Sequence, residues 1–384
     1  MPPLRTSDGA LLLPSTPDTV LWGWLPNRDT PPALHVEDGD VVAIETVSHE
    51  GILEDQGRDP VAWFGRHGIE RSDVLADARE IAASDISHEF GDGPHIVTGP
   101  IRVNGAQPGD VLKVEVLQLE LRAPYGVISN RHGLGCLAGE FPETTVYVPG
   151  ACAARPELYG SVSHFTRVEE SRGTWFGLLP YGTEGRVARF PLAPFLGIMG
   201  VAPDTSQPVP SVPPGDHGGN IDINLLNTGA ILYLPVQVEG AGFHAGDPHY
   251  AQGDGEVALT ALEAPLSATL RLSVLKGPRI REAVGVLDRP FVETETHWIP
   301  VGLDRDLDEA MRKATRAAVR FLETAIGMGR AEALAYLSAA ADFEISQVVD
   351  TVRVSTAASA KRTSAEPARA TGQVGPVSSV RLGG

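Results

Sequence analysis

Residues 218–257 read GGNIDINLLNTGAILYLPVQVEGAGFHAGDPHYAQGDGEV. Short apolar runs alternate here with Gly, Pro, Asn and Asp, which are typical of the turns that bound β-strands. The pattern predicts four strands in and just after this stretch, at 220–226, 230–238, 256–263 and 268–275. Pro235 lies inside the second strand and indicates an edge strand or a bulge, because proline has no N–H to donate.

The segments on either side extend the β pattern and then add helices. Further strands are predicted at 34–47, 95–103, 111–121 and 344–354. Apolar residues recur every three or four positions over 306–326, which predicts a helix, and a second helix follows at about 331–341. Because Gly (42) and Pro (31) are frequent among the 384 residues, long helices cannot dominate. The sequence therefore predicts a mainly β (α+β) chain with helices near its C-terminus.

Composition divides the chain into five segments. Residues 1–33 are predicted to be an irregular N-terminal arm, and 203–219 a Pro-rich connector between two β-rich halves, 34–202 and 220–356. Residues 357–384 are small, polar and basic, which predicts a disordered tail.

Charge and motifs exclude several classes of protein. The formal net charge is −18, whereas nucleic acids and anionic membranes attract basic surfaces. No run of 18 apolar residues and no signal-peptide pattern is present, so a cytoplasmic location is expected. Cys136 and Cys152 lack the spacing of a thiolate metal site, and no GxSxG, P-loop or HExxH motif occurs.

Acidic, amide and imidazole residues gather around residues 216–256. They are Asp216, His217, Asn220, Asp222, His244, Asp247, His249, Gln252, Asp254 and Glu256. Such oxygen and nitrogen ligands suit a divalent cation. In strands, Asn220 and Asp222 would share one face, as would Asp254 and Glu256, so paired strands would bring them together.

A simpler interpretation of these residues stays open. Asp and Asn beside Gly are ordinary turn residues, because they tolerate left-handed backbone and hydrogen-bond to their own chain. Turns alone do not explain why two histidines and a glutamate occur in the same segments. His95, between two Gly-Pro pairs, is a further candidate ligand from another part of the chain.

The quoted stretch closely resembles the central signature of the acetamidase/formamidase family. HIVTGPIRVNGAQPGDVLKVEVLQL at 95–119 and the segments 293–323 and 336–350 are similar to other parts of that family. The resemblance implies hydrolysis of a short, neutral aliphatic amide to ammonia and a carboxylate. It also implies a β-sandwich of CUB-like or jelly-roll type with C-terminal helices packed on it. A divalent metal, zinc or alternatively calcium, and a homodimer or higher homo-oligomer are implied as well.

The resemblance places the signature residues at Asn220, Asp222, Asp247, His249, Gln252, Asp254 and Glu256. From these we predict four metal ligands, His95, Asp222, His249 and Asp254. Glu256 is the predicted general base, with Glu140 as a remote alternative, and Asn220 or Gln252 the predicted donor to the oxyanion. Asp247, His217 and His244 are further candidates. Pro248 and Tyr250 depart from the usual signature, which leaves the choice of substrate open.

Two other functions remain open at this point. The scaffold could hydrolyse another C–N bond, in a carbamate, a guanidine, or a longer or cyclic amide. It could also be a non-catalytic module that binds a small molecule and uses its metal structurally, since structural metals are usually fully ligated by protein.

Overall fold

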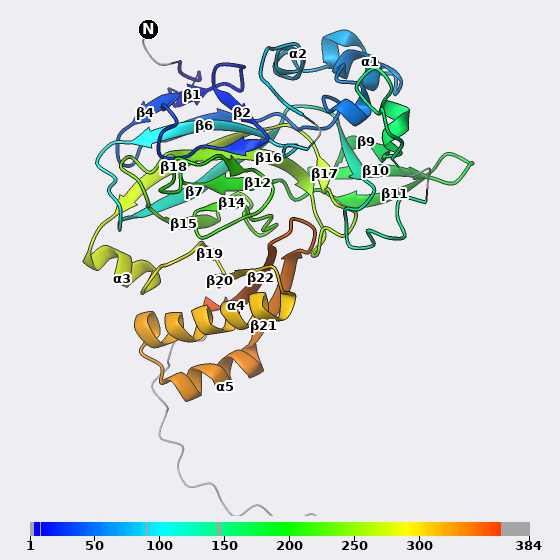
Figure 1. Ribbon diagram of the computed structural model, residues 1–384. Helices are drawn as coiled ribbons and strands as arrows, with labels where there is room; N and C mark the ends of the chain where they lie inside the picture. Colours follow the sequence, from blue (N-terminus) through cyan, green and yellow to red (C-terminus); the bar gives the residue numbers. More distant parts are fainter. Residues whose placement is uncertain (1–3, 8, 90, 144–146, 362–384) are drawn as a thin grey trace, which may run out of the picture.

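The computed structural model describes residues 4–7, 9–89, 91–143 and 147–361. Most of the fold consists of two large β-sheets, with helices at the periphery (Figure 1). The predicted mainly β class with C-terminal helices is therefore confirmed.

The nine-stranded sheet has the order β1-β5-β18-β7-β15-β19-β20-β22-β21. Its strands are β1 Leu11–Leu13, β5 Val41–Glu45, β18 Leu266–Leu275, β7 Val111–Leu121, β15 Ile231–Pro235, β19 Phe291–Glu293, β20 His297–Asp304, β22 Arg353–Ala360 and β21 Ala341–Gln347. β7 alternates as predicted, because Leu112, Val114 and Val116 are buried while Lys113 and Glu115 are half-buried. Pro235 ends β15, which pairs on both sides, so the predicted edge position for this strand is wrong.

The eleven-stranded sheet has the path β11-β10-β9-β8-β17-β16-β12-β14, and β6 joins β16 to β2 and β4. Its strands are β2 Val20–Trp22, β4 Leu34–Val36, β6 Ile96–Val103, β8 Tyr125–Asn130, β9 Val162–Ser171, β10 Thr174–Tyr181, β11 Arg186–Pro191, β12 Phe195–Gly200, β14 Gly218–Asn220, β16 Phe243–Ala251 and β17 Leu262–Glu263. A small separate sheet pairs β3 Trp24–Leu25 with β13 Val209–Pro210.

The two large sheets share one hydrophobic core. Leu232 of β15 and Leu270 of β18, in the nine-stranded sheet, belong to the same buried cluster as Phe195 of β12 and Phe243 of β16. Fully burying an aliphatic or aromatic side chain contributes about 1.5–3 kcal/mol, so this shared core holds the sheets together.

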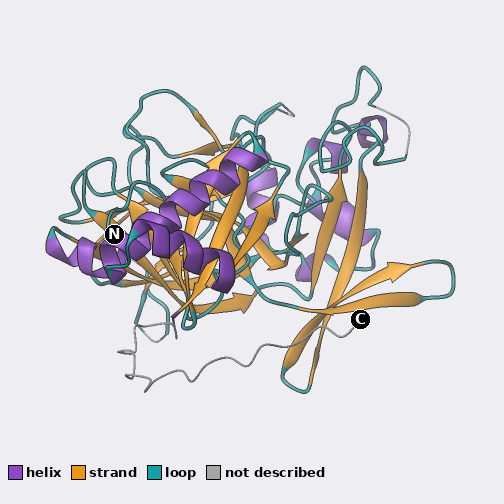
Figure 2. Cartoon of the chain, turned by 90° about the horizontal axis from the view of Figure 1, so that it is seen from below, coloured by secondary structure: helices purple, strands orange, loops and turns teal. Residues whose placement is uncertain are grey.

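Helices cover one end of the nine-stranded sheet (Figure 2). α4 Leu307–Phe321 begins at Asp306, whose carboxylate accepts a hydrogen bond from the backbone N–H of Glu309, and continues as a π-helical turn, Leu322–Ile326. α5 Arg330–Ala340 follows, which confirms both predicted helices. The remaining helices are α1 Pro60–Gly65, α2 Ala76–Ala82 and α3 Pro278–Val284, with 3₁₀ turns at Glu54–Gln56, Arg71–Asp73 and Pro156–Tyr159. No helix among the described residues is both long and apolar enough to cross a membrane.

Several predicted segments have a different structure. The expected irregular arm, 1–33, contains β1, β2 and β3. The expected tail begins too early at 357, because β22 continues to Ala360; residues 362–384 lie outside the described part. Strands from before and after the 203–219 connector pair in both large sheets, as β7 does with β15 and β12 does with β16. The chain therefore does not separate into two structural halves at that point.

Candidate functional site

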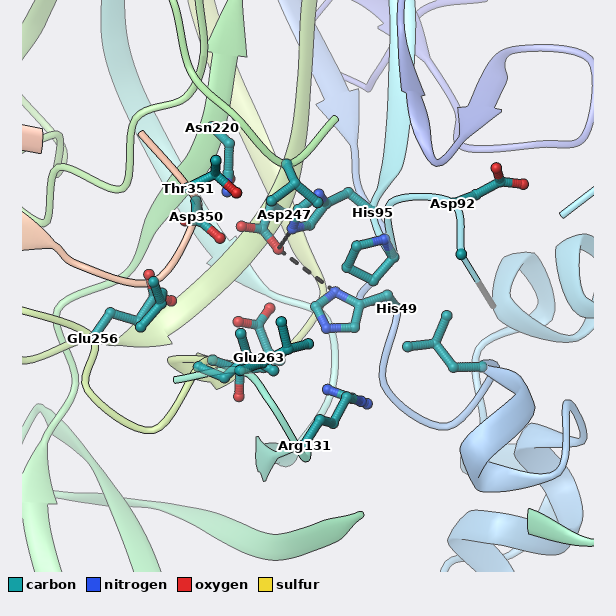
Figure 3. Close-up of a pocket in the computed structure, with 18 of the residues that line it drawn as sticks. His49, Asp92, His95, Arg131, Asn220, Asp247, Glu256, Glu263, Asp350 and Thr351 are labelled. Carbon is teal, nitrogen blue, oxygen red and sulfur yellow. Dashed lines mark ion pairs between the residues drawn. The ribbon is translucent and has the colours of Figure 1, made fainter. Parts of the chain in front are cut away.

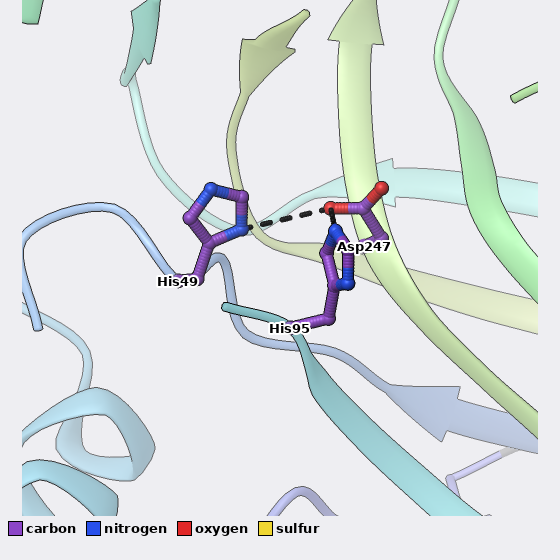
Figure 4. Close-up of side chains that lie close together, drawn as sticks. All are labelled: His49, His95 and Asp247. Atoms are coloured by element: carbon purple, nitrogen blue, oxygen red, sulfur yellow. Dashed lines mark ion pairs between the residues drawn. The ribbon is translucent and has the colours of Figure 1, made fainter. Parts of the chain in front are cut away.

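Acidic and imidazole side chains from distant parts of the chain meet at one buried place. His49 follows β5, His95 precedes β6, and Asp247 lies in β16. Figure 4 shows both imidazoles directed at the carboxylate of Asp247. His49 Nδ1 and His95 Nε2 lie 3.6 and 3.8 Å from Asp247 Oδ1.

The same cluster continues on the other side of Asp247. His249 Nε2 lies 3.0 Å from Asp247 Oδ2, 3.0 Å from Glu263 Oε1 and 4.0 Å from Glu256 Oε1. Asp222 and Asp350 complete the group. We call these eight residues the central cluster: His49, His95, Asp222, Asp247, His249, Glu256, Glu263 and Asp350.

Each histidine of the central cluster has a polar group from outside it near one ring nitrogen, and for His95 and His249 this contact is a hydrogen bond. Glu50 lies 3.4 Å from His49 Nε2, Ser211 Oγ lies 2.9 Å from His95 Nδ1, and Gln252 Oε1 lies 3.0 Å from His249 Nδ1. The opposite nitrogen of each ring points to Asp247. This is the arrangement of metal-ligating histidines, in which an outer partner fixes the ring and the inner nitrogen coordinates.

The backbone is shaped to let these side chains converge. A Cβ on Gly197 of β12 would lie 2.5 Å from Asp222 Oδ1 and 2.6 Å from Asp247 Oδ2, so no larger residue fits here. Asp222, Asp247 and Glu256 adopt left-handed backbone, with φ of 47°, 49° and 46°. Such conformations cost about 1–3 kcal/mol for non-glycine residues and are concentrated at functional sites.

Burial and mutual repulsion strongly perturb the carboxyl groups. Burial, with Glu256 and Asp350 nearby, raises the pKa of Asp222 well above its usual range. Burial also raises the pKa of Glu256 and Glu263, and raises that of Asp350 to about 7. Like charges cannot all ionise at this distance unless cations or protons compensate them. The cluster is therefore built to hold positive charge.

The histidines differ from one another in the same environment. Burial lowers the pKa of His95 to about 4. Burial alone would also lower the pKa of His49, but its contacts with Asp247 and Glu50 outweigh this and raise it to about 10. The nearby cation Arg131 does not neutralise the central cluster directly, because its guanidinium bonds Glu50 at 3.1 Å and Asp55 at 2.7 Å.

A divalent cation fits these residues. Ligand atoms within 4.8 Å of one another occur in four overlapping groups: His49, His95 and Asp247; Asp222, Asp247 and His249; His249, Glu256 and Glu263; and Asp222, Glu256 and Asp350. Several buried atoms here have no hydrogen-bond partner among the described residues, among them both oxygens of Asp222, Asp247 Oδ1 and His249 Nε2. Buried polar atoms without partners are rare and costly, and coordination would satisfy them.

A cavity of about 270 Å³ opens beside the central cluster (Figure 3). Asp247, Glu256 and Glu263 line it, as do His49 and His95. Asn220 also lines it; its side-chain oxygen is buried and has no partner among the described residues. The cavity therefore brings a small molecule to the same groups that could hold a cation.

The predicted site residues fall into two sets. His95, Asp222, Asp247, His249 and Glu256 belong to the central cluster, and Asn220 lies beside it. Asp254 does not belong: it is exposed, and it accepts a hydrogen bond from Asn224 at 2.9 Å. Glu140 is exposed on a loop.

The remaining candidates have other surroundings. The side-chain amide of Gln252 donates to the carbonyls of Asp222 and Ser346, and its oxygen contacts His249, so its polar groups are already engaged. His217 and His244 belong to none of the four groups of cation ligands found among the described residues. His244 Nδ1 is 3.2 Å from the carbonyl of Gly242.

Sequence reasoning missed His49, Glu263 and Asp350. His49 and Asp350 lie far along the chain from 216–256, and Glu263 ends the same predicted strand as Glu256 without any feature that sets it apart. Glu263 reaches the cluster because β17 pairs with β16 and places it opposite His249, and Asp350 reaches it in the turn between β21 and β22. His49 comes from the segment that follows β5 of the other large sheet. No local pattern marks them, although the adjacent pair His49-Glu50, directly after a predicted strand, is a weak signal.

The chain is similar to known proteins of one family. The profile of the Acetamidase/Formamidase family matches residues 69–210 and 205–360. The formamidase of Methylophilus methylotrophus is 28% identical over an alignment of 286 residues that covers 66% of this chain and 63% of that protein. The acetamidase of Mycolicibacterium smegmatis is 28% identical over an alignment of 234 residues that covers 51% of this chain and 57% of that protein.

The fold has solved relatives as well. The crystal structure of an acetamidase from Yersinia enterocolitica superposes with a TM-score of 0.69 and 22% sequence identity. The match covers 95% of this chain and 96% of that one. The fold and the site together define a mainly β protein with a buried centre of histidines and carboxylates. The family match covers most of the sequence, and the chain belongs to the acetamidase/formamidase family. The matched part is somewhat less than two thirds of the length of these two sequence relatives.

Proposed function

We propose that this protein is a metal-dependent hydrolase of carboxylic amides that releases ammonia and a carboxylate. The family match and the relatives named formamidase and acetamidase support the reaction. The observation that supports the metal dependence is the arrangement of three histidines directed at Asp247, two of which, His95 and His249, are hydrogen-bonded from outside the cluster.

His49, His95 and Asp247 would hold the cation, with Asp222 and His249 on the other side of Asp247. Imidazole ligands favour zinc over calcium, which prefers oxygen ligands alone, so zinc is the expected metal and calcium the alternative. A divalent cation bound here supplies Lewis-acid polarisation of the amide carbonyl and of the attacking water.

The chain's own groups perform the proton transfers. Glu256 borders the cavity, and its raised pKa suits a group that accepts a proton from water and then delivers it to the leaving nitrogen. Ammonia is a poor leaving group unless it is protonated, so one carboxyl can serve both steps. Asn220 is placed to donate its amide N–H to the oxyanion, and the engaged Gln252 acts by holding His249.

The open cavity favours an enzyme over the binding module with a structural metal. A structural ion is normally enclosed by protein ligands, whereas a catalytic ion keeps a position open to substrate. Hydrolysis of other C–N bonds fits the same groups and is tested by the same assay. The remaining expectations, a CUB-like or jelly-roll sandwich, a homodimer or higher oligomer and a cytoplasmic location, stay predictions.

The test combines elemental analysis with ammonia release from formamide, acetamide and a panel of larger amides, carbamates and guanidines. We expect bound zinc, loss of turnover on chelation and its return on adding zinc. His49→Ala should lose metal and turnover, whereas His35→Ala changes an exposed histidine outside the cluster and should lose neither. Full turnover in chelated protein would refute the metal dependence.

A further inference from the structure

The cavity is larger than formamide or acetamide needs. Its volume is about 270 Å³. A water-sized group occupies about 30 Å³ in a liquid, so roughly nine such groups would fill it. The volume of formamide or acetamide is less than half that of the cavity. Much of the cavity therefore stays unfilled, even when a cation and its water are bound beside the substrate.

Apolar side chains line the cavity beside the polar groups. The apolar residues lining it are Leu53, Pro94, Leu134, Val212, Leu259 and Val349. They come from segments far apart in the sequence, so the apolar wall is not a property of one helix or strand. Apolar surface next to a reaction centre favours a substrate that can cover it.

The charged lining disfavours an anionic substrate. Six carboxyl groups of the described residues border the cavity. Asp247, Glu256, Glu263 and Asp350 belong to the central cluster, whose charge protons and a bound cation compensate, and Glu54 and Asp92 lie outside it, with Glu54 3.0 Å from His88 Nδ1. Arg131 also borders it, but Glu50 and Asp55 already pair with its charge. A substrate with a carboxylate on its acyl chain would meet repulsion, whereas an uncharged hydrocarbon chain would not.

We propose that the site prefers primary amides whose acyl group is an uncharged hydrocarbon chain of several carbons, over formamide and acetamide. This inference rests on the proposed function. The water oxygen forms the new bond to the carbonyl carbon, the C–N bond breaks, and the nitrogen leaves as ammonia with one proton of that water, while the other proton passes to solvent. The acyl chain remains along Leu134, Leu53 and Val349 and leaves as the carboxylate.

The first experiment measures kcat/KM of the zinc-loaded full chain for acetamide, butanamide and hexanamide by ammonia release. Each buried methylene group should raise kcat/KM roughly fourfold until the wall is covered. A flat or falling series would overturn the inference.

A pair of variants tests the wall itself. Leu134→Gln introduces a polar group at a lining residue that is 45% exposed, so the core is not disturbed. Leu137, on the same loop and 48% exposed, is not a lining residue of this cavity, and Leu137→Gln is the control. We expect Leu134→Gln to lower kcat/KM for hexanamide several-fold more than for acetamide, and the control to lower neither. Equal behaviour of the two variants would overturn the inference.

The outcomes distinguish this inference from the proposed function. Acetamide hydrolysis without any gain for hexanamide contradicts the preference and leaves the hydrolase in place. Absence of turnover with every amide, in protein shown to contain zinc, contradicts both.

Discussion

At the scale of single residues, the site depends on which carboxylates are buried together. Carboxylates in similar local sequences can differ in this respect. Asp247 and Asp254 both follow a glycine. Asp247 is 3% exposed and lies between three histidines, whereas Asp254 faces solvent and pairs with Asn224. The two residues therefore form a matched pair for testing the centre.

Asp247→Asn should lose most of the bound metal, because it replaces the carboxylate that all three histidine rings approach. Asp254→Asn should keep its metal and its turnover within about twofold, since changes at exposed sites usually have small effects. Metal content per chain by elemental analysis is the measurement. Equal metal loss in both variants would contradict the arrangement of ligands described above.

Glu256→Gln tests the proton-transfer role. The amide keeps the shape of the side chain but cannot accept a proton, so kcat should fall by roughly 10²–10⁴-fold. The metal should remain, because the set around His49, His95 and Asp247 is untouched. Single-turnover ammonia release on protein of known metal content makes the measurement, and near-normal rates would transfer the role to Glu263 or Asp350.

The sequence predicted part of this site because those residues are close together in the chain. Asp222, Asp247, His249 and Glu256 lie within one stretch rich in Gly, Asp and His, and His95 adjoins a strand. Whether an aspartate beside glycine is a ligand or a turn residue depends on burial, which local pattern does not contain, and Asp254 was misassigned for that reason. His49, Glu263 and Asp350 became visible only in the folded chain.

At the scale of elements, the site sits where β12 and β16 lie side by side. Gly197 of β12 leaves the space that the carboxylates of Asp222 and Asp247 and the ring of His249 occupy. A strand residue with a side chain would push these three groups apart. The strand thus contributes to the site through a missing side chain, which no search for chemically active residues could find.

Gly197→Ala should weaken metal binding roughly 10- to 100-fold, as changes beside metal ligands commonly do. Gly65→Ala is the control, since a Cβ at Gly65 meets no atom within 4 Å. Zinc affinity by competition with a chelating dye measures the effect. Unchanged affinity in Gly197→Ala would show that the cluster can rearrange around a methyl group.

The sequence predicts some helices and strands correctly and others only in part. The 111–121 strand and the two C-terminal helices have long regular periods and were found. The stretch 220–226 is a strand only to Asn220, because Asp222 takes a left-handed backbone and leaves the sheet. Within 256–263 only Leu262 and Glu263 are strand, since the preceding residues form the turn that carries Glu256. The strand predictions are wrong where the chain turns to place Asp222 and Glu256 in the site.

At the scale of the whole molecule, the C-terminal part completes the nine-stranded sheet. β22 lies between β20 and β21, and Ala357 packs in the cluster that joins α4 and α5 to the sheet. Gln347, at the end of β21, binds the backbone of Val349 and Asp350 through its side-chain oxygen. The fold of this region therefore determines where Asp350 meets the central cluster.

Truncation after Ala357 should destabilise the protein by about 2–4 kcal/mol, because it removes the pairing of Ser359 with both Trp298 and Ala341. Truncation after Lys361 keeps all these contacts and serves as the control. Urea denaturation followed by tryptophan fluorescence measures the difference. Equal midpoints for the two truncations would mean that the end of β22 contributes nothing.

The left-handed conformations of Asp222, Asp247 and Glu256 have a consequence for protein engineering. Substitutions that relax these three positions, such as glycine or asparagine, would raise heat resistance while dismantling the reaction centre. Screens that select for thermal tolerance alone would thus tend to recover inactive chains. Improvements made without losing catalysis have to come from parts of the molecule away from this strained region.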